Sequence, residues 1–201
     1  MTVQSDLNLR ALLRSGDLVV DPLLDEREQV KGAKIDVRLD NKFCVLRSEQ
    51  SQAWDFQTGG QDVVKHYERV DIGYAGKFIL HPGNFVIGQT FETIRIPKEM
   101  LGRIEGRSSL ARRGVLIHVT ASVIDPGFAG NICLELYNLG HVPVILNPLM
   151  RVGALTIERV DGEVKNEYSG SGQFAGDAID AGLRQKPDRD FLRIAECIRS
   201  I

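Results

Sequence analysis

The chain has 201 residues, of which 43% are hydrophobic and 26% charged, with a formal net charge of −2. These values are ordinary for a globular protein, and the length suits one all-β domain over residues 1–201. Without a basic surplus, nucleic acid and anionic membranes are not expected as partners. The sequence has no charged-then-apolar leader and no apolar run of about 18 residues, so we expect a cytoplasmic protein without a membrane span.

A short helix is predicted to open the chain. Ser5 or Asp6 can cap it, an apolar stripe begins at Leu9, and Gly16 is placed to end it. A weak strand pattern follows at 18–20.

Short strands and frequent turns are predicted from there to about residue 160. Alternating apolar and polar residues mark strands at 35–39, 77–80 and 93–96, and turn clusters lie at 81–84, 125–127 and 147–148. This pattern favours a sandwich, jelly roll or distorted barrel over a βαβ fold. Residues 48–75 are polar and irregular, and we predict an insertion or a long surface loop there.

The C-terminal part has a different composition. Residues 166–190 are rich in Gly, Ser, Asp and Gln, and we expect a mobile tail. Phe191, Ile194, Ala195 and Ile198 recur at helical spacing. This spacing predicts a terminal amphipathic helix that docks on the domain or on a partner subunit.

Common nucleotide-site motifs are missing from the sequence. There is no P-loop, and the His66–Glu68 triplet, which has the H-x-E form of zinc deaminases, lacks the P-C-x-x-C partner of that motif. A deaminase with this sequence would therefore work without zinc, and no metal ligands are predicted.

Residues 106–114 have the composition of a phosphate-binding turn. Ser108 or Ser109 can cap a short helix, and Gly114 can close it. Two hydroxyls and the flanking Arg107 would suit a phosphate group. A capped connector with exposed arginines is an equally good interpretation of this segment alone.

Residues 131–138 form a predicted strand with two different faces. Ile132, Leu134 and Leu136 fall on one face, whereas Cys133 and Glu135 fall on the other. A carboxylate in such a half-apolar setting would suit a proton shuttle. The alternative is a solvated glutamate on an open sheet face, and strand geometry alone favours that alternative.

Four segments resemble, in order and spacing, the motifs of the dCTP deaminases in the dCTP deaminase/dUTPase superfamily: Arg107–Arg112 (RSSLAR), His118–Ala121 (HVTA), Ile124–Phe128 (IDPGF) and Leu134–Asn138 (LELYN). Gly32–Leu39 and His81–Gly83 resemble the family's first motif and a later turn, so the match covers about residues 5–160. The resemblance implies a mainly β, dUTPase-like distorted jelly roll or β-barrel with an N-terminal and a C-terminal helix. It also implies a homotrimer whose sites are shared between subunits.

The resemblance distinguishes two branches of this superfamily at Glu135. dUTPases usually carry an apolar residue at that position, whereas dCTP deaminases carry a glutamate. The implied reaction is hydrolytic deamination of dCTP to dUTP and ammonia. Glu135 would be the general base and acid, and Arg112 would orient it. Ser108 and the Ala121 backbone would place the base and the attacking water.

The resemblance also implies how the rest of the nucleotide is bound. The triphosphate would carry Mg²⁺ through its own oxygens, Asp125 would bind the 3′-hydroxyl, and Phe128 would shape the sugar pocket. Members of the family often respond to dTTP, which makes dTTP a candidate inhibitor. The implied substrate-binding residues are Arg107, Ser108, Ser109, Leu110, Ala111, Arg112, Asp125, Phe128, Cys133, Leu134, Glu135, Tyr168 and Gln173.

Departures from the family pattern keep other functions open. The tail around 173–177 lacks the lysine that family tails usually offer to the phosphates. Val123 stands where many simple deaminases have arginine, and Phe128 stands where they often have tryptophan. In both departures this sequence resembles the bifunctional enzymes, which form dUMP and diphosphate. A pure dUTPase would leave Glu135 unexplained. The altered tail also motivates a non-catalytic deoxynucleotide sensor.

Overall fold

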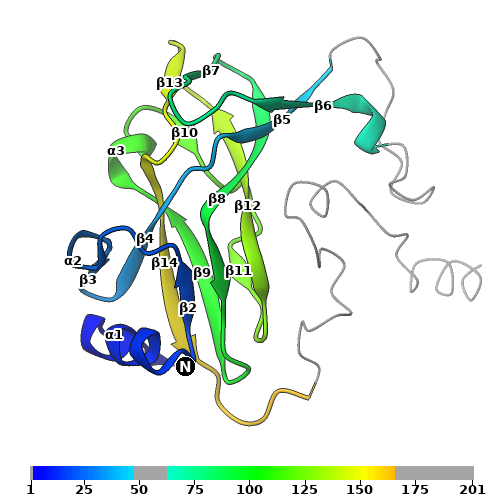
Figure 1. The fold of residues 1–201 in the computed structure, drawn as a ribbon. Coiled ribbons are helices and arrows are strands. Elements are labelled where there is room, and N and C mark those ends of the chain that lie inside the picture. Colours follow the sequence, from blue (N-terminus) through cyan, green and yellow to red (C-terminus); the bar gives the residue numbers. More distant parts are fainter. Residues whose placement is uncertain (1, 48–62, 166–201) are drawn as a thin grey trace, which may run out of the picture.

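The computed structural model describes residues 2–47 and 63–165 (Figure 1). The predicted tail, Tyr168, Gln173, the predicted terminal helix and most of the predicted loop lie outside these residues. The helices are α1 (Asp6–Ser15), α2 (Glu26–Gln29), α3 (Ser108–Ala111) and the 3-10 helix η1 (Val63–His66). The strands are β1 (Thr2–Val3), β2 (Val19–Asp21), β3 (Val30–Lys31), β4 (Lys34–Arg38), β5 (Lys42–Leu46), β6 (Tyr67–Asp71), β7 (Phe78–Leu80), β8 (Phe85–Arg95), β9 (Met100–Gly106), β10 (Val115–Leu116), β11 (Val123–Ile124), β12 (Ala129–Asn138), β13 (Val144–Leu146) and β14 (Arg151–Arg159).

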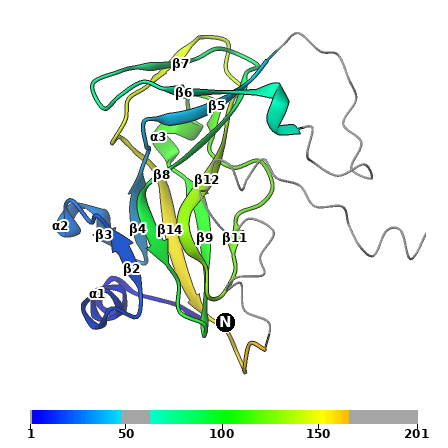
Figure 2. The ribbon, with the colours of Figure 1, turned by 45° about the vertical axis from the view of Figure 1, so that its right-hand side comes forward.

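The strands form antiparallel sheets, which confirms the predicted mainly β class. One sheet has the order β11-β9-β14-β4-β3, with β1 paired to β14. A second has the order β10-β12-β8-β5-β6, with β2 paired to β8, and β13 and β7 form a separate ribbon. This ribbon and α1 lie at opposite ends of the molecule in both views (Figures 1 and 2).

The core lies between the inward faces of the two large sheets. In β12, Leu134 and Leu136 are fully buried and alternate with half-buried residues, as their predicted faces require. They pack with Ile35 and Leu155 of the other sheet in one apolar cluster. Burial of each such side chain contributes about 1.5–3 kcal/mol relative to exposure, and it fixes which face of β12 points outward.

Helix α1 begins and ends at the predicted residues. The Ser5 hydroxyl accepts the N–H of Asn8 as the N-terminal cap, and Gly16 ends the helix at a left-handed φ of 75°. Leu9 is completely buried. Arg10 forms an ion pair with Glu26, which ties α1 to α2.

The sequence missed one strand and most of another. Strand β6 lies inside the stretch predicted as loop; within the described residues it pairs with β5 alone, at the edge of its sheet. Its two half-buried residues, Tyr67 and Val70, are three positions apart, so the strand shows no period-two alternation. Strand β8 begins at Phe85 rather than at Thr93. Most of it is buried on both faces, and such a strand shows no period-two pattern.

Candidate active site

Glu135 lies in the middle of β12 on the face opposite Leu134 and Leu136. Its backbone is fixed on both sides, because it pairs with Ile87 of β8 and donates its N–H to the Ile117 carbonyl at 2.9 Å. The side chain is half-buried. The structure therefore holds this carboxylate on a rigid strand and away from the core, as predicted.

The Glu135 carboxylate is held by one hydrogen bond from the backbone. The Val119 N–H donates to Oε2 at 2.7 Å. Among the described residues, no other group donates to this carboxylate. A charged acceptor strengthens such a bond. One oxygen is thus positioned while Oε1 stays available for proton exchange.

Neutral, largely apolar side chains surround Glu135 on this face. Cys44 and Ile87 are buried, and Tyr67 and Cys133 pack against them. Burial, then the nearby Glu135 and then Cys44 raise the pKa of Cys133 to about 12. Burial, followed by the two cysteines, also raises the pKa of Tyr67. Near neutral pH the thiol of Cys133 and the phenol therefore stay uncharged beside the carboxylate.

The predicted phosphate-binding segment does form a short helix, α3, but it is not capped as predicted. Arg107 is the N-terminal cap residue, and no side chain makes a capping hydrogen bond. Its carbonyl accepts the N–H groups of Leu110 and Ala111. Ser108 is therefore already the first helical residue, and its hydroxyl is not in the capping position. Ser108 and Ser109 are exposed.

Two other features anchor α3. Leu110 is 6% exposed and packs in the core, whereas Ala111 is exposed. Gly114 has a φ of 78°, and its N–H bonds to the Ala111 carbonyl at 2.9 Å, so it closes the turn as predicted. A Cβ at Gly114 would lie 2.6 Å from the Gly140 nitrogen. Glycine is thus needed here for its conformation and for space.

The guanidinium of Arg107 is held by one residue of β4 and one residue of β14. Its Nη1 donates to the Arg151 carbonyl at 3.1 Å, and its Nη2 lies 3.5 Å from Oδ2 of Asp36. The side chain is 27% exposed. These contacts hold the guanidinium beside α3 while leaving part of it open to a ligand.

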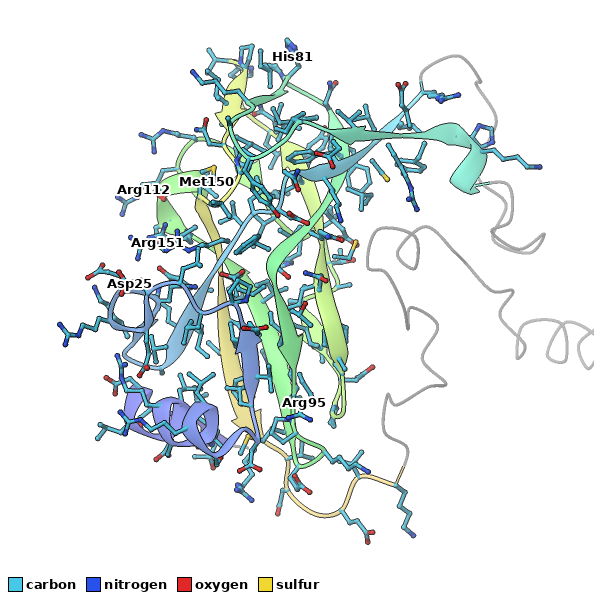
Figure 3. The ribbon with its side chains drawn as sticks, viewed as in Figure 1. Asp25, His81, Arg95, Arg112, Met150 and Arg151 are labelled. Atoms are coloured by element: carbon cyan, nitrogen blue, oxygen red, sulfur yellow. The ribbon has the colours of Figure 1, made fainter. Side chains whose placement is uncertain are left out.

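Arg112 follows α3 and has an exposed side chain. Among the described residues, it makes no side-chain hydrogen bond or ion pair. In Figure 3 it extends outward from α3. A single chain therefore does not join Arg112 to Glu135, and the role predicted for Arg112 remains a prediction.

The predicted sugar-binding turn connects β11 with β12. The Phe128 N–H bonds to the Asp125 carbonyl at 3.2 Å across Gly127, whose φ is 82°. Asp125 is exposed, and Phe128 packs partly against the core. Because β11 pairs with one large sheet and β12 with the other, this turn joins the two sheets.

The remaining predicted residues differ in accessibility. Ala121 is exposed, whereas the Leu134 side chain is completely buried, so only its backbone could contact a ligand. Val119 and Asp36 hold predicted site residues but were missed as candidates. Val119 lies within the HVTA motif, yet a backbone donor has no signature in the sequence. Asp36 lies in the first family-like motif, where its role was not recognised.

No group of three or more metal-binding side chains occurs in residues 2–47 and 63–165. Across the same residues, no helix is long and apolar enough to cross a membrane.

Comparison with known proteins identifies the family. A family model described as dCTP deaminase-like matches residues 3–160. A dCTP deaminase of Haloarcula marismortui is 37% identical over 192 residues, which cover 94% of this chain and 97% of the relative. A dUMP-forming dCTP deaminase of Halobacterium salinarum is 39% identical over 193 residues, with the same coverage.

The fold agrees with this assignment. The crystal structure of a 2′-deoxycytidine 5′-triphosphate deaminase from Agrobacterium tumefaciens superimposes with a TM-score of 0.60 at 22% identity. The superposition covers 77% of this chain and 46% of that longer chain. With the family model over most of its length and relatives above 30% identity, this chain belongs to the dCTP deaminase-like family.

Proposed function

We propose that the protein is a dCTP deaminase, which converts dCTP and water to dUTP and ammonia. The observation that carries this proposal is Glu135: a half-buried carboxylate on a rigid strand, with one oxygen held by the Val119 N–H and the other available. Family membership and the names of the relatives support the same reaction.

Glu135 would carry protons between the two reactants. As water attacks C4 of the cytosine ring, the carboxylate takes one proton from the water and delivers it to N3. A second proton from the new hydroxyl then passes to the amino group, the C4–N bond breaks, and ammonia leaves. A positioned carboxyl group contributes about 10²–10⁴-fold in such transfers. The Val119 N–H would keep the carboxylate aimed during both steps.

The triphosphate would be bound by Arg107, Ser108 and Ser109, with Mg²⁺ held through the phosphate oxygens. Asp36, the carboxylate that contacts Arg107, is already engaged by three cations, so the phosphates are the natural ligands of the metal. Magnesium would offset the negative charge of the nucleotide. Tyr168, Gln173 and the Asp125–Phe128 turn would complete the binding of the nucleotide.

A homotrimer would unite Arg112 with Glu135. Because a single chain leaves the exposed Arg112 without a partner among the described residues, a second copy is the natural source of its neighbour. Mixing inactive Arg112→Ala and Glu135→Gln subunits tests this. Hybrid trimers would contain some sites with both native residues, and activity would return. Two preparations that stay inactive after verified subunit exchange would contradict shared sites.

The reaction is tested by incubating the purified protein with dCTP, and separately with dUTP, in Mg²⁺, and separating the products by chromatography. Ammonia and dUTP from dCTP support the proposal. Binding of dCTP without any product would favour the non-catalytic sensor.

Adding dTTP to the same assay tests whether dTTP inhibits the reaction. We also propose a cytoplasmic location, since deoxynucleoside triphosphates are made and used there.

A bifunctional enzyme is the second candidate. One relative of 39% identity is named as dUMP-forming, and Val123 and Phe128 stand at positions that resemble the bifunctional branch. Formation of dUMP and diphosphate from dCTP would establish this function. Formation of dUTP from dCTP, with added dUTP left intact, would establish the simple deaminase.

A further inference from the structure

A buried carboxylate, Asp36, lies at the centre of a cluster of basic side chains next to α3. Asp36 is 5% exposed. Its Oδ1 lies 3.2 Å from the Lys34 ammonium, and its Oδ2 lies 3.3 Å from Arg151 Nη1 and 3.5 Å from Arg107 Nη2. Two guanidinium groups thus share one carboxylate oxygen.

The cluster has a surplus of positive charge. The second carboxylate nearby is that of Glu28, whose Oε2 lies 2.9 Å from the Lys31 ammonium and 3.9 Å from Arg151 Nη1. Its side chain is 54% exposed, so water weakens its effect on Arg151. Lys31 and the three cations around Asp36 make four basic groups, and these face only the two carboxylates of Asp36 and Glu28. The local charge is unbalanced, which favours an anion.

Strand pairing directs Arg151 into this cluster. Strand β14 lies between β9 and β4, and its register against β4 shifts between Arg151 and Gly153. A shift of this kind re-aims the side chain at which it occurs. Arg151 Nη1 is then fixed by Asp36 and by the Glu28 carbonyl at 3.1 Å. The guanidinium is thus held by a residue of strand β4 and by a residue of helix α2 rather than by a loop.

Arg151 keeps hydrogen-bond donors for a ligand. Its side chain is 29% exposed, and among the described residues neither Nε nor Nη2 makes a hydrogen bond. The two guanidinium groups are neighbours, because Arg107 Nη2 and Arg151 Nη1 both contact Oδ2 of Asp36. Arg151 and Arg112 extend from the same side of the molecule (Figure 3).

We propose that Arg151, positioned by Asp36, is a further phosphate-binding residue and favours the triphosphate over less charged nucleotides. The inference rests on the proposed function, in which Arg107 binds the phosphates. An added fixed cation attracts a triphosphate more strongly than a monophosphate, because the attraction grows with the ligand's charge. Arg151 can also contact a phosphate through two parallel donors.

The test compares Arg151→Gln, Arg151→Lys and the control Arg103→Gln. Arg103 is a similar arginine of β9, 35% exposed and paired with Glu158 at 2.9 Å, outside the cluster. We expect Arg151→Gln to raise KM for dCTP about tenfold, the loss typical of a charge-assisted hydrogen bond, and to lower the preference for dCTP over dCMP. Arg151→Lys should fall between, because it keeps the charge and loses the second donor. Arg103→Gln should behave as the parent.

Calorimetry with inorganic tripolyphosphate separates this inference from the proposed function. An affinity that falls about tenfold in Arg151→Gln supports the phosphate site, even if dCTP releases no ammonia and the proposed function fails. Equal affinities for tripolyphosphate in the parent and in Arg151→Gln would overturn the inference, even with full deaminase activity. If Arg151→Gln does not fold, a crystal structure of the parent with tripolyphosphate decides. A phosphate oxygen in hydrogen-bond contact with Arg151 supports the site, and phosphates bound elsewhere refute it.

Discussion

Replacement of Glu135 by glutamine changes the proposed proton carrier and little else. The two side chains have nearly the same size and shape, and a glutamine oxygen can still accept the Val119 N–H that now lies 2.7 Å from Oε2. The amide cannot take up and release a proton near neutral pH. The variant therefore separates proton transfer from packing and substrate binding.

The structure sets the expected size of each effect. Loss of general acid–base catalysis should lower kcat by about 10²–10⁴-fold, which raises the barrier by about 3–5 kcal/mol. The Val119 hydrogen bond changes from a charged to a neutral acceptor, which costs about 1 kcal/mol of stability. Because the site lies on the outer face of β12 and the core face is untouched, the fold should persist. The affinity for dCTP should change by less than about threefold, since the proposed phosphate and sugar contacts do not involve Glu135.

Ammonia release from dCTP gives kcat, and calorimetry with dCTP gives the affinity of the inactive variant. Glu105→Gln is the matched control: Glu105 is an exposed glutamate on β9 whose Oε2 lies 3.5 Å from Nε2 of His118. It should keep the parent rate. A Glu135→Gln enzyme within tenfold of the parent rate would refute the proton-carrier role. Loss of dCTP binding in that variant would show that Glu135 holds the substrate instead.

Three further predictions concern groups around the site and the core. Burial raises the pKa of the completely buried Glu92 despite hydrogen bonds from Arg38 and Gln29. The folded state therefore binds this proton more tightly than the unfolded state does, and Glu92 lowers stability as pH rises from its ordinary value of 4.5 through its raised pKa. Urea unfolding across this range should show that Glu92→Gln removes that part of the slope; an unchanged slope would contradict the assignment. With a pKa of about 12, Cys133 has about one thiolate in 10⁴ molecules at pH 8. Mass spectrometry should therefore find slow labelling of Cys133 by iodoacetamide in the folded protein. Labelling should be fast in urea, because unfolding removes the burial that raises the pKa. Gly114→Ala should lower the free energy of unfolding by more than Gly162→Ala does. Both glycines have a positive φ, which costs an alanine about 1–2 kcal/mol. A Cβ at Gly114 would in addition meet close neighbours, whereas one at Gly162 would not. Equal losses would refute the close approach at Gly140.

The sequence predicted elements whose local signals agree with their packing. The alternation in 131–138 placed Glu135 outward, and the structure buries Leu134 and Leu136 on the opposite face. The caps of α1 were also readable, because a serine and a glycine satisfy helix ends through contacts only a few residues away. Period and capping act locally, so they leave a signal in the sequence itself.

Strands without such a signal were misread. Strand β8 is buried on both faces and β6 is an exposed edge strand, so neither alternates between apolar and polar residues. The cap of α3 was misplaced for a related reason: two adjacent serines both fit a capping pattern, but the backbone turns one residue earlier, at Arg107. The Val119 contact to Glu135 depends on a backbone N–H, which every residue but proline has.

The cluster around Asp36 marks the limit of prediction from sequence most clearly. Its members come from the N-terminal cap of α3, directly after β9, from β4 and from the start of β14, and Arg107 and Arg151 are 44 residues apart. They meet only because β14 pairs with β9 on one side and with β4 on the other. Strand order is decided by how the whole core packs, so no local pattern encodes it. The RSSLAR motif could therefore be recognised in the sequence, whereas the contacts that join Arg107 to Asp36 and to Arg151 required the sheet.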